Sequence, residues 1–492
     1  MNWVLIFNFL TCWIFSLSIS YYLMINLQWY NYSFYRVFTK HHKFLWHIFY
    51  FFAPTLLFII TGFYTSQIVF YGFSILFYFL FFPYLLLWII NLDKKLQFTR
   101  RVKTFFGILF LFLLLHQITS IILKATFHSI TFIIPVVLAF FISSWYEKIL
   151  FNRYLALAKS KVNHLKDLKI IAVTGSFGKT SIKNFLEQIL SVQYQVYATP
   201  RSVNTIKGIV SDVNENLQKN IQIYIAEAGA RQKGDIKEIA QLLNPHYAII
   251  GEIGAQHIEY FKTIENITQT KFELLESKRL QKAFIYQANP LPQDIQKNKV
   301  TLYPDQLKDT EATLDKTSFS LKIDGVFYPF ETNVLGTFNI ANLSVAILMA
   351  HELKIPIPTI QKIISNIKPI PHRLQKSVAR GKIILDDSFN GNLNGMLEAI
   401  RIASLYEGRK IIITPGLVES DLQSNIALAK AIDEVFDLAI ITGDLNSKIL
   451  SNHIKNPQKI ILKNKSQLEN ILLTSTHKGD LLLFANDAPN FI

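Results

Sequence analysis

A glycine-rich segment followed by Lys179 and Thr180 has the residue types and spacing that hold a nucleotide phosphate. It reads Thr174-Gly175-Ser176-Phe177-Gly178-Lys179-Thr180-Ser181. Glycines let backbone N–H groups approach phosphate oxygens, and the N-terminus of a following helix adds partial positive charge. In such loops the lysine reaches the terminal phosphates and the threonine hydroxyl holds Mg²⁺. The sequence therefore predicts a nucleotide site here, although Val173 stands where the general pattern has a further glycine.

The residues on either side of this loop predict the elements that would position it. Residues 169–173 form a short apolar run typical of a strand. Apolar residues after the loop recur at the spacing of an amphipathic helix, at Ile182, Phe185, Leu186, Ile189 and Leu190. A strand, a glycine turn and a helix in this order are the arrangement that a phosphate loop needs.

Glu227 is the first candidate for a metal ligand further along the chain. It follows an alternating apolar run over residues 221–225, which predicts a strand that ends near this carboxylate. A carboxylate at the carboxyl end of a strand beside a phosphate loop is placed to meet the magnesium ion of the nucleotide. Without that context, Glu227 could equally be a solvated residue at a strand end.

His257 and Lys271 are two further candidates. His257 follows a strand predicted at residues 247–250, and Lys271 lies in a helix predicted over residues 264–280. Taken alone, the first could be an ordinary loop histidine and the second an ordinary exposed lysine.

In their order along the chain, these segments resemble the Mur ligases, the ATP-dependent amide-forming enzymes of peptidoglycan synthesis. The shortened phosphate loop is that family's form. The resemblance continues in Gly336-Thr337-Phe338-Asn339-Ile340-Ala341-Asn342, where Phe338 replaces the usual histidine of an adenine-contacting element and Asn339 and Asn342 carry over. Arg373 matches the family's arginine at a domain junction.

The segment Asp386-Asp387-Ser388-Phe389-Asn390-Gly391-Asn392 resembles one branch of the family in particular. It is similar to the signature of the ligases that add D-alanyl-D-alanine to UDP-N-acetylmuramoyl-tripeptide, with Phe389 in place of tyrosine and Leu393 in place of proline. Other members, folylpolyglutamate synthetases included, usually have a histidine in this segment. The resemblance covers residues 169–492.

The resemblance implies ligation of those two substrates through an acyl phosphate, with ATP and two Mg²⁺ ions and with Lys271 carbamylated. The implied catalytic residues are Lys179, Glu227, His257, Lys271 and Arg373. The implied nucleotide-binding residues are Thr174, Gly175, Ser176, Phe177, Gly178, Lys179, Thr180, Ser181, Asn339, Asn342, Arg373 and Asp387. The implied metal ligands are Thr180, Glu227, His257 and Lys271.

Two other functions stay open at this point. One is a membrane-anchored ligase of the same fold that forms another amide bond, in a polyglutamate-like polymer or a lipid-linked precursor. The apolar N-terminal part favours it, whereas the Asp386–Asn390 segment opposes it. The other is a membrane transporter or scaffold whose nucleotide domain only gates or binds. The joint presence of Glu227, His257 and Lys271 opposes that function, because gating needs no second metal site.

The first 148 residues have the composition of a membrane region. Five apolar stretches approach or reach the roughly 20 residues that cross a bilayer, at about 3–25, 44–64, 68–91, 104–123 and 129–145. Residues 1–150 carry ten Lys/Arg and only two Asp/Glu, so about half of the net charge of +15 lies there. Because this charge flanks apolar segments, it does not indicate that the protein binds nucleic acid. The first and third connections are basic, and the second and fourth are nearly neutral. This pattern predicts an N-terminus outside and everything after residue 146 in the cytoplasm.

The expected architecture is therefore an α-helical transmembrane region followed by two α/β domains. Its segments are a membrane region at 1–148, a basic juxtamembrane linker at 149–168, a P-loop ATPase-like central domain at 169–372 and a Rossmann-like C-terminal domain at 373–492. Strand-like runs at 382–385, 410–414, 438–442, 459–462 and 480–484 support the last of these. The small uridine-binding domain with which this branch of the family normally begins is replaced by the apolar stretches. We expect a multi-pass protein of the bacterial inner membrane with the lipid bilayer, and other peptidoglycan-synthesis enzymes there, as partners.

Overall fold

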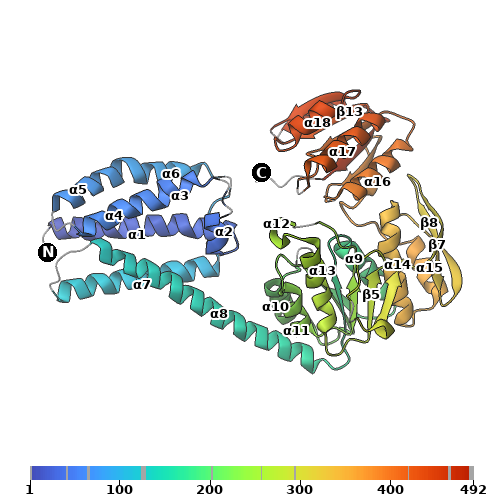
Figure 1. Cartoon of the computed structure of the whole chain (residues 1–492), viewed down its shortest axis with the longest axis horizontal. Coiled ribbons are helices and arrows are strands. Elements are labelled where there is room, and N and C mark those ends of the chain that lie inside the picture. Colours follow the sequence, from blue (N-terminus) through green and yellow to red (C-terminus); the bar gives the residue numbers. More distant parts are fainter. Residues whose placement is uncertain are drawn as a thin grey trace. The chain divides into compact units, whose positions relative to one another are not determined.

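The computed structural model describes residues 3–39, 41, 43–63, 67–92, 94–123, 129–200, 203–255, 258–292, 295–389, 391–418, 420–463 and 467–486. The chain forms two compact units, residues 1–153 and residues 154–492 (Figure 1). Each unit is described by itself below.

The first unit consists of helices built from the five apolar stretches. Its elements are α1 (Trp3–Trp29), α2 (Phe34–Thr39), α3 (Leu45–His47), η1 (Ile48–Phe52), α4 (Ala53–Phe63), α5 (Gln67–Leu76), η2 (Phe77–Phe81), α6 (Phe82–Ile90), α7 (Arg100–Ile122), η3 (Ser129–Phe132) and α8 (Ile133–His164). Within the described residues, five helical segments are long and apolar enough to cross a membrane: Trp3–Trp29, Leu45–Phe63, Gln67–Ile90, Arg100–Ile122 and Ser129–His164. The five predicted stretches are thus confirmed as helices.

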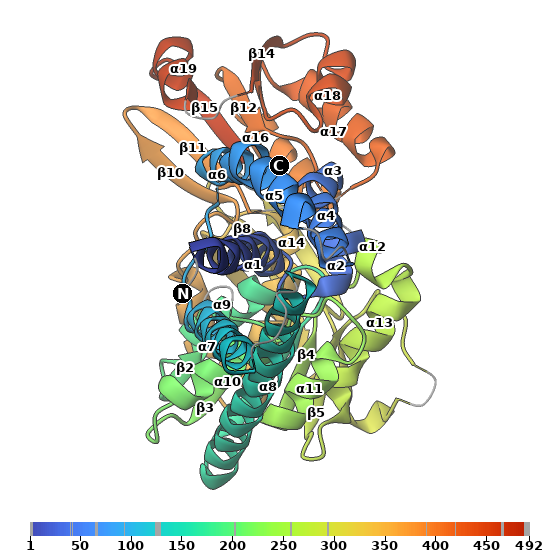
Figure 2. The same cartoon turned by 90° about the vertical axis from the view of Figure 1, so that its left-hand side faces the viewer.

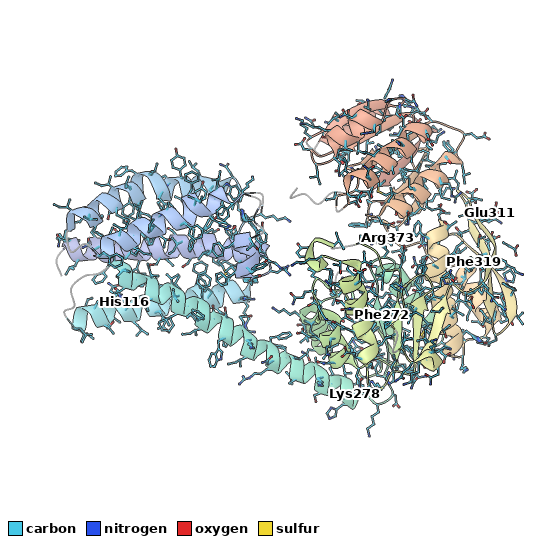
Figure 3. All side chains as sticks on the ribbon, in the orientation of Figure 1. His116, Phe272, Lys278, Glu311, Phe319 and Arg373 are labelled. Carbon is cyan, nitrogen blue, oxygen red and sulfur yellow. The ribbon has the colours of Figure 1, made fainter. Side chains whose placement is uncertain are left out.

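Aromatic side chains fill the core of this unit. Phe15 of α1 stacks on Phe58 of α4 with ring centroids 4.2 Å apart, and both side chains are fully buried. His116 of α7, labelled in Figure 3, pairs its Nε2 with the Thr131 hydroxyl at 2.8 Å. The last helix, α8, is unbroken from residue 133 to residue 164 (Figure 2), so most of the predicted linker is helical.

The second unit begins with the last turns of α8, from residue 154 on, and continues into a six-stranded, all-parallel sheet in the order β2-β3-β1-β4-β5-β6. Its strands are β1 (Lys169–Thr174), β2 (Val196–Ala198), β3 (Ile223–Glu227), β4 (Tyr247–Ile250), β5 (Lys282–Tyr286) and β6 (Val300–Tyr303). Its helices are α9 (Lys179–Leu190), α10 (Ile206–Glu215), α11 (Asp235–Leu243), α12 (Ile258–Phe261), α13 (Ile264–Phe272), α14 (Thr337–Glu352) and α15 (Ile357–Ser365). The predicted strand, loop and helix of the phosphate site are confirmed as β1 and α9.

Two predictions for this part need correction. The strand predicted over 221–225 begins two residues later, at Ile223, and runs to Glu227 itself. The helix predicted to run to residue 280 ends at Phe272 and tightens into a single turn, η4 (Glu273–Glu276). The Glu273 carboxylate accepts hydrogen bonds from the backbone N–H groups of Gly234 and Lys237, which ties this turn to the start of α11.

A small antiparallel sheet follows that the sequence did not predict. It has the order β7-β8-β9, with β7 (Leu307–Ala312), β8 (Thr317–Ile323) and β9 (Val326–Thr332). Alternate residues of β8 are buried, and Phe319, labelled in Figure 3, joins the core of the central sheet together with Leu321 and Ile323.

The C-terminal sheet also has six strands, in the order β10-β11-β15-β12-β13-β14. They are β10 (Gln375–Ala379), β11 (Lys382–Asp387), β12 (Lys410–Thr414), β13 (Leu438–Thr442), β14 (Gln458–Leu462) and β15 (Leu481–Ala485), with α16 (Leu393–Ser404), α17 (Leu422–Val435), α18 (Ser447–His453) and α19 (Leu468–Ser475) between them. All pairs are parallel except β10 with β11. The five predicted runs are confirmed to within two residues, and β10 is an additional edge strand. In Figure 1 this domain is drawn in orange and red.

Candidate active site

The predicted phosphate loop connects β1 to α9 at the carboxyl edge of the central sheet. The strand is buried over residues 170–174, and the apolar face of α9 packs into the same core, so both ends of the loop are fixed. Gly178 directly precedes the helix with φ +78°, a conformation that side chains rarely adopt. A Cβ on Gly178 would lie 2.4 Å from Oδ1 of Asn342 in α14. Glycine is therefore required here both by the backbone and by its neighbour.

The segment after β4 supports the loop from its other side. The backbone N–H groups of Ser176 and Phe177 both donate to the Glu252 carbonyl, at 2.8 and 3.1 Å. A Cβ on Gly175 would lie 3.0 Å from the Cα of Gly251. The Thr174 hydroxyl donates to the Ala228 carbonyl at 2.8 Å, which fixes the strand end. The loop is thus built from backbone in close contact with backbone, and its shape is set before any ligand binds.

The Lys179 side chain folds back over the loop. Its ammonium donates to the carbonyls of Gly175 and Ser176, each at 2.8 Å. Burial lowers the pKa of Lys179 to about 8; the Glu227 carboxylate raises this pKa, and the Arg373 cation lowers it. The amine is therefore mostly cationic at neutral pH and lies across the loop, where a phosphate would meet it.

Thr180 and Glu227 meet at the edge of the sheet, as predicted. The Thr180 hydroxyl donates to Oε2 of Glu227 at 3.0 Å, and the Asn204 amide donates to Oε1 at 3.3 Å. Glu227 is only 4% exposed. A hydroxyl and a carboxylate oxygen at this distance fit a single Mg²⁺ ion, which usually binds one or two carboxylates together with substrate phosphates and water. Within the described ranges, no group of three or more His, Cys, Asp or Glu side chains could hold a metal without such phosphates.

Lys183 also contacts Glu227, and the sequence did not single it out. Its ammonium lies 3.4 Å from Oε2 of Glu227 and donates to the Thr199 carbonyl at 2.6 Å, and the residue is 2% exposed. The signal was present in the sequence, since a lysine four residues after Lys179 shares its side of the helix.

Lys271 lies on α13 and is 4% exposed. Its pKa is lowered to about 7, mainly by burial and also by the nearby Lys179 cation, whereas the carboxylates of Asp235 and Glu227 oppose the shift. No hydrogen bond or ion pair reaches this amine from the part of the chain that the structure describes. Phe272, the next residue, is labelled in Figure 3. His257, the fourth predicted metal ligand, lies outside the described residues.

The two asparagines predicted to contact adenine lie at the start of α14. Asn339 is 1% exposed, and its amide donates to the Leu335 carbonyl at 2.8 Å. Its Oδ1 accepts from the Asn342 amide at 3.3 Å, so Asn339 orients Asn342. Asn342 in turn lies against Gly178, which connects this helix to the phosphate loop.

Arg373 and Asp387 lie close to one another at the start of the C-terminal domain. Arg373 (labelled in Figure 3) donates to the Phe389 carbonyl. The Asp387 carboxylate is fully buried and accepts from the backbone N–H of Leu374 at 3.0 Å. Asp386 accepts from the Ser388 hydroxyl at 2.6 Å. Further along the segment, the Asn392 side chain caps α16. The segment Asp386–Phe389 therefore also stabilises the backbone where the central domain joins the C-terminal domain.

Comparison with known proteins gives consistent matches. The family model described as the Mur ligase middle domain matches residues 173–350. The UDP-N-acetylmuramoyl-tripeptide--D-alanyl-D-alanine ligase of Bacillus subtilis is 27% identical over 349 residues, which are 67% of this chain and 75% of that protein.

Solved structures agree with these matches at the level of the fold. A MurF structure from Acinetobacter baumannii has a TM-score of 0.61 at 21% identity and covers 68% of this chain and 77% of its own. The MurF ligase from Thermotoga maritima in complex with ADP has a TM-score of 0.60 at 20% identity. The match covers 68% of this chain and 80% of that chain.

Proposed function

This chain is a ligase of the Mur type, and from that premise we propose that it joins D-alanyl-D-alanine to UDP-N-acetylmuramoyl-tripeptide at the expense of ATP. The contact between Thr180 and Glu227 beside the phosphate loop carries the proposal, because it combines a phosphate cradle with a place for Mg²⁺. The similarity of the chain to ligases with these substrates supports the choice of substrates.

The proposed reaction has two steps. A carboxylate of the tripeptide attacks the γ-phosphorus of ATP, releases ADP and becomes an acyl phosphate. The amine of D-alanyl-D-alanine then attacks the acyl carbon, and the tetrahedral intermediate expels inorganic phosphate as the amide forms. Both steps bring a nucleophile to a centre that carries negative charge, so the protein's task is to position the reactants and to neutralise charge.

Lys179 and the start of α9 supply the fixed positive charge. The Lys179 ammonium would exchange its two carbonyl partners, Gly175 and Ser176, for oxygens of the β- and γ-phosphates. The backbone N–H groups at the start of α9 point to the same place and add the positive end of the helix dipole. Charge that develops on the transferred phosphoryl group is then stabilised by groups that the fold has already oriented.

Mg²⁺, when bound, screens the charge between the carboxylate and the phosphates. Thr180 and Glu227 would hold one ion, and a second would rest on His257 and a carbamylated Lys271. Carbamylation forms a bond between the neutral amine and the carbon of CO₂ and releases the amine's proton to solvent, so the side chain ends as an anionic carbamate. An amine with a pKa of about 7 is partly neutral at physiological pH, which favours this reaction at Lys271.

The remaining predicted residues would bind the nucleoside end of ATP. Asn342, held by Asn339, would contact adenine beside the loop that it already touches. Arg373 and Asp387 would complete the site from the C-terminal domain, where Asp387 holds the backbone of the junction. These assignments rest on the family resemblance together with the positions described above.

We further propose that the five apolar helices span the inner membrane of a bacterium and keep the ligase in the cytoplasm at its inner face. Basic residues in the first and third connections would face the cytoplasm, as cationic loops usually do. Attachment near other peptidoglycan-synthesis enzymes would raise the local concentration of the product without adding contacts in the active site.

The function can be tested on the full chain purified in detergent. Phosphate release from ATP should require UDP-N-acetylmuramoyl-tripeptide and D-alanyl-D-alanine together, and mass spectrometry should find the pentapeptide product. The Glu227→Gln variant should lose this activity. Turnover only with a lipid-linked muramoyl peptide would support the alternative ligase. Absence of turnover with every carboxylate and amine pair, despite nucleotide binding, would support a scaffold.

A further inference from the structure

The Glu227 carboxylate contacts one buried cation, Lys183, before any nucleotide arrives, and a second cation, Lys179, lies nearby. Oε2 accepts from the Thr180 hydroxyl at 3.0 Å and has the Lys183 ammonium at 3.4 Å. Lys179 is close enough that Glu227 raises its pKa. The proposed metal ligand is thus already paired with a lysine before any metal binds. Such a pairing is unusual at a metal site, since Mg²⁺ prefers anionic oxygen ligands.

We infer that Lys183 excludes free Mg²⁺ from Glu227, so that the metal enters only together with the phosphates of the nucleotide. The inference rests on the proposed nucleotide site and assigns Lys183 the role of a positioning residue. A magnesium ion would need to approach Oε2 to about 2.1 Å, the same oxygen that Lys183 contacts. The two cations would then share one carboxylate oxygen in a poorly solvated place, where repulsion between charges is weakly screened.

The surroundings of Lys183 keep the ammonium in place. Its donation to the Thr199 carbonyl at 2.6 Å fixes the end of the side chain. The Thr199 hydroxyl accepts from the Glu227 N–H at 3.1 Å, so the lysine and the carboxylate are held by the same residue. Lys183 is 2% exposed, so the ammonium has little room to swing into solvent when a metal approaches. Only a ligand that carries its own negative charge offsets this repulsion, and a nucleotide polyphosphate does so.

A structural role alone would predict something different. If Lys183 only compensated the buried Glu227 charge, its removal would lower stability without creating a metal site. If it excludes the metal, removal of its charge leaves an anionic oxygen beside the Thr180 hydroxyl that can bind a divalent cation directly. Binding of Mn²⁺ without nucleotide therefore separates the two roles, and it does not depend on turnover.

The experiment measures Mn²⁺ binding to the full chain by electron paramagnetic resonance, with and without ADP. The variants are Lys183→Met, which removes the charge, and Lys183→Arg, which keeps it. Lys219→Met is the matched control, because Lys219 is an exposed lysine beyond α10. Without ADP, Lys183→Met should gain one Mn²⁺ site. This site should bind Mn²⁺ at least about tenfold more tightly than the wild-type protein does under the same conditions. The double variant Lys183→Met, Glu227→Gln should lose that site, and Lys183→Arg and Lys219→Met should match the wild type.

Unchanged Mn²⁺ binding in a folded Lys183→Met variant that still binds Mn²⁺ with ADP would overturn the inference. If that variant does not fold, Glu227→Gln decides the question. The inference expects Glu227→Gln to match the wild type without ADP and to bind Mn²⁺ more weakly with ADP. A wild-type site that exists without ADP and disappears in Glu227→Gln would refute the exclusion. Failure of the proposed function would look different, because the wild type would then not bind Mn²⁺ with ADP at all.

Discussion

Oδ1 of Asn342 lies 2.4 Å from the place where a Cβ on Gly178 would stand. The start of α14 therefore leaves no room for a side chain at this position of the phosphate loop. Because Asn339 orients Asn342 through a hydrogen bond of 3.3 Å, a change in the loop would reach both residues that are proposed to meet adenine. One methyl group at Gly178 thus tests whether loop and helix act together.

Gly178→Ala should abolish nucleotide binding and lower the stability by roughly 1–3 kcal/mol, because it combines a strained φ with a steric clash. Gly234→Ala is the control: its φ of +94° is also left-handed, but nothing lies within 4 Å of its would-be Cβ. Thermal melts and ADP titration would compare the two variants. Equal losses of ADP affinity would show that backbone strain alone, and not contact with Asn342, explains the effect.

Lys179→Ala should keep the fold and lose ligation. Its ammonium donates to two loop carbonyls, which can turn to water when the lysine is removed. Loss of a charge-assisted contact in the transition state should cost on the order of 3 kcal/mol, about a hundredfold in kcat/KM. Steady-state kinetics and circular dichroism would measure the two properties. Near-normal ligation in this variant would contradict the nucleotide site.

The parts of this structure that could be predicted are those that neighbouring residues specify. A strand, a glycine turn and an amphipathic helix lie within one short stretch. The central parallel strands of the C-terminal sheet, β12, β13 and β15, are mostly apolar runs because both of their faces are buried. The edge strand β10 was missed because Gln375–Ala379 is mostly polar and pairs only with β11.

The small β-sheet was not predicted, although part of it has a local signal: Asp324-Gly325 is a typical hairpin turn between the alternating residues of β8 and β9.

Other features depend on contacts between distant residues. The pairing of Lys183 with Glu227 was harder to predict. The spacing of four residues places Lys183 on the same side of α9 as Lys179, but nothing in the sequence shows that Glu227 of β3 lies beside it. The capping of α11 by Glu273 depends in the same way on residues far apart in the chain, because Gly234 and Lys237 donate to its carboxylate.

The proposed membrane topology predicts opposite locations for two connections. Reporter fusions after residue 65 should report the outside, because that connection carries no charge, and fusions after residue 98 should report the cytoplasm, because its neighbours are basic. Alkaline phosphatase and green fluorescent protein fusions would give complementary signals at each position. The same signal from both positions would contradict the topology.

Stability should depend on pH through Lys271. Burial lowers its pKa from an ordinary value of 10.5 to about 7, so between these pH values the unfolded chain binds a proton that the folded chain does not. The free energy of unfolding therefore gains a contribution that rises with pH across this window and is absent in Lys271→Met. The difference in Tm between the wild type and Lys271→Met, measured in CO₂-free buffer without nucleotide, should shift in favour of the wild type from pH 7 to pH 10. A pH-independent difference would show that the amine does not titrate in this range.

Carbamylation of Lys271 is the last prediction. A plain ammonium close to the Lys179 cation and a metal would be repelled, whereas a carbamate would be attracted. Activity should therefore fall in CO₂-free buffer and return with bicarbonate, and it should return faster at pH 8 than at pH 6, because only the neutral amine reacts with CO₂. Lys271→Arg should stay nearly inactive under all of these conditions, since a guanidinium keeps the charge and forms no carbamate. Lys271→Ala should regain part of its activity with a short carboxylate such as acetate, which can fill the place of the carbamate. Full activity of Lys271→Arg, or activity that is indifferent to CO₂ in the wild type, would contradict the modification.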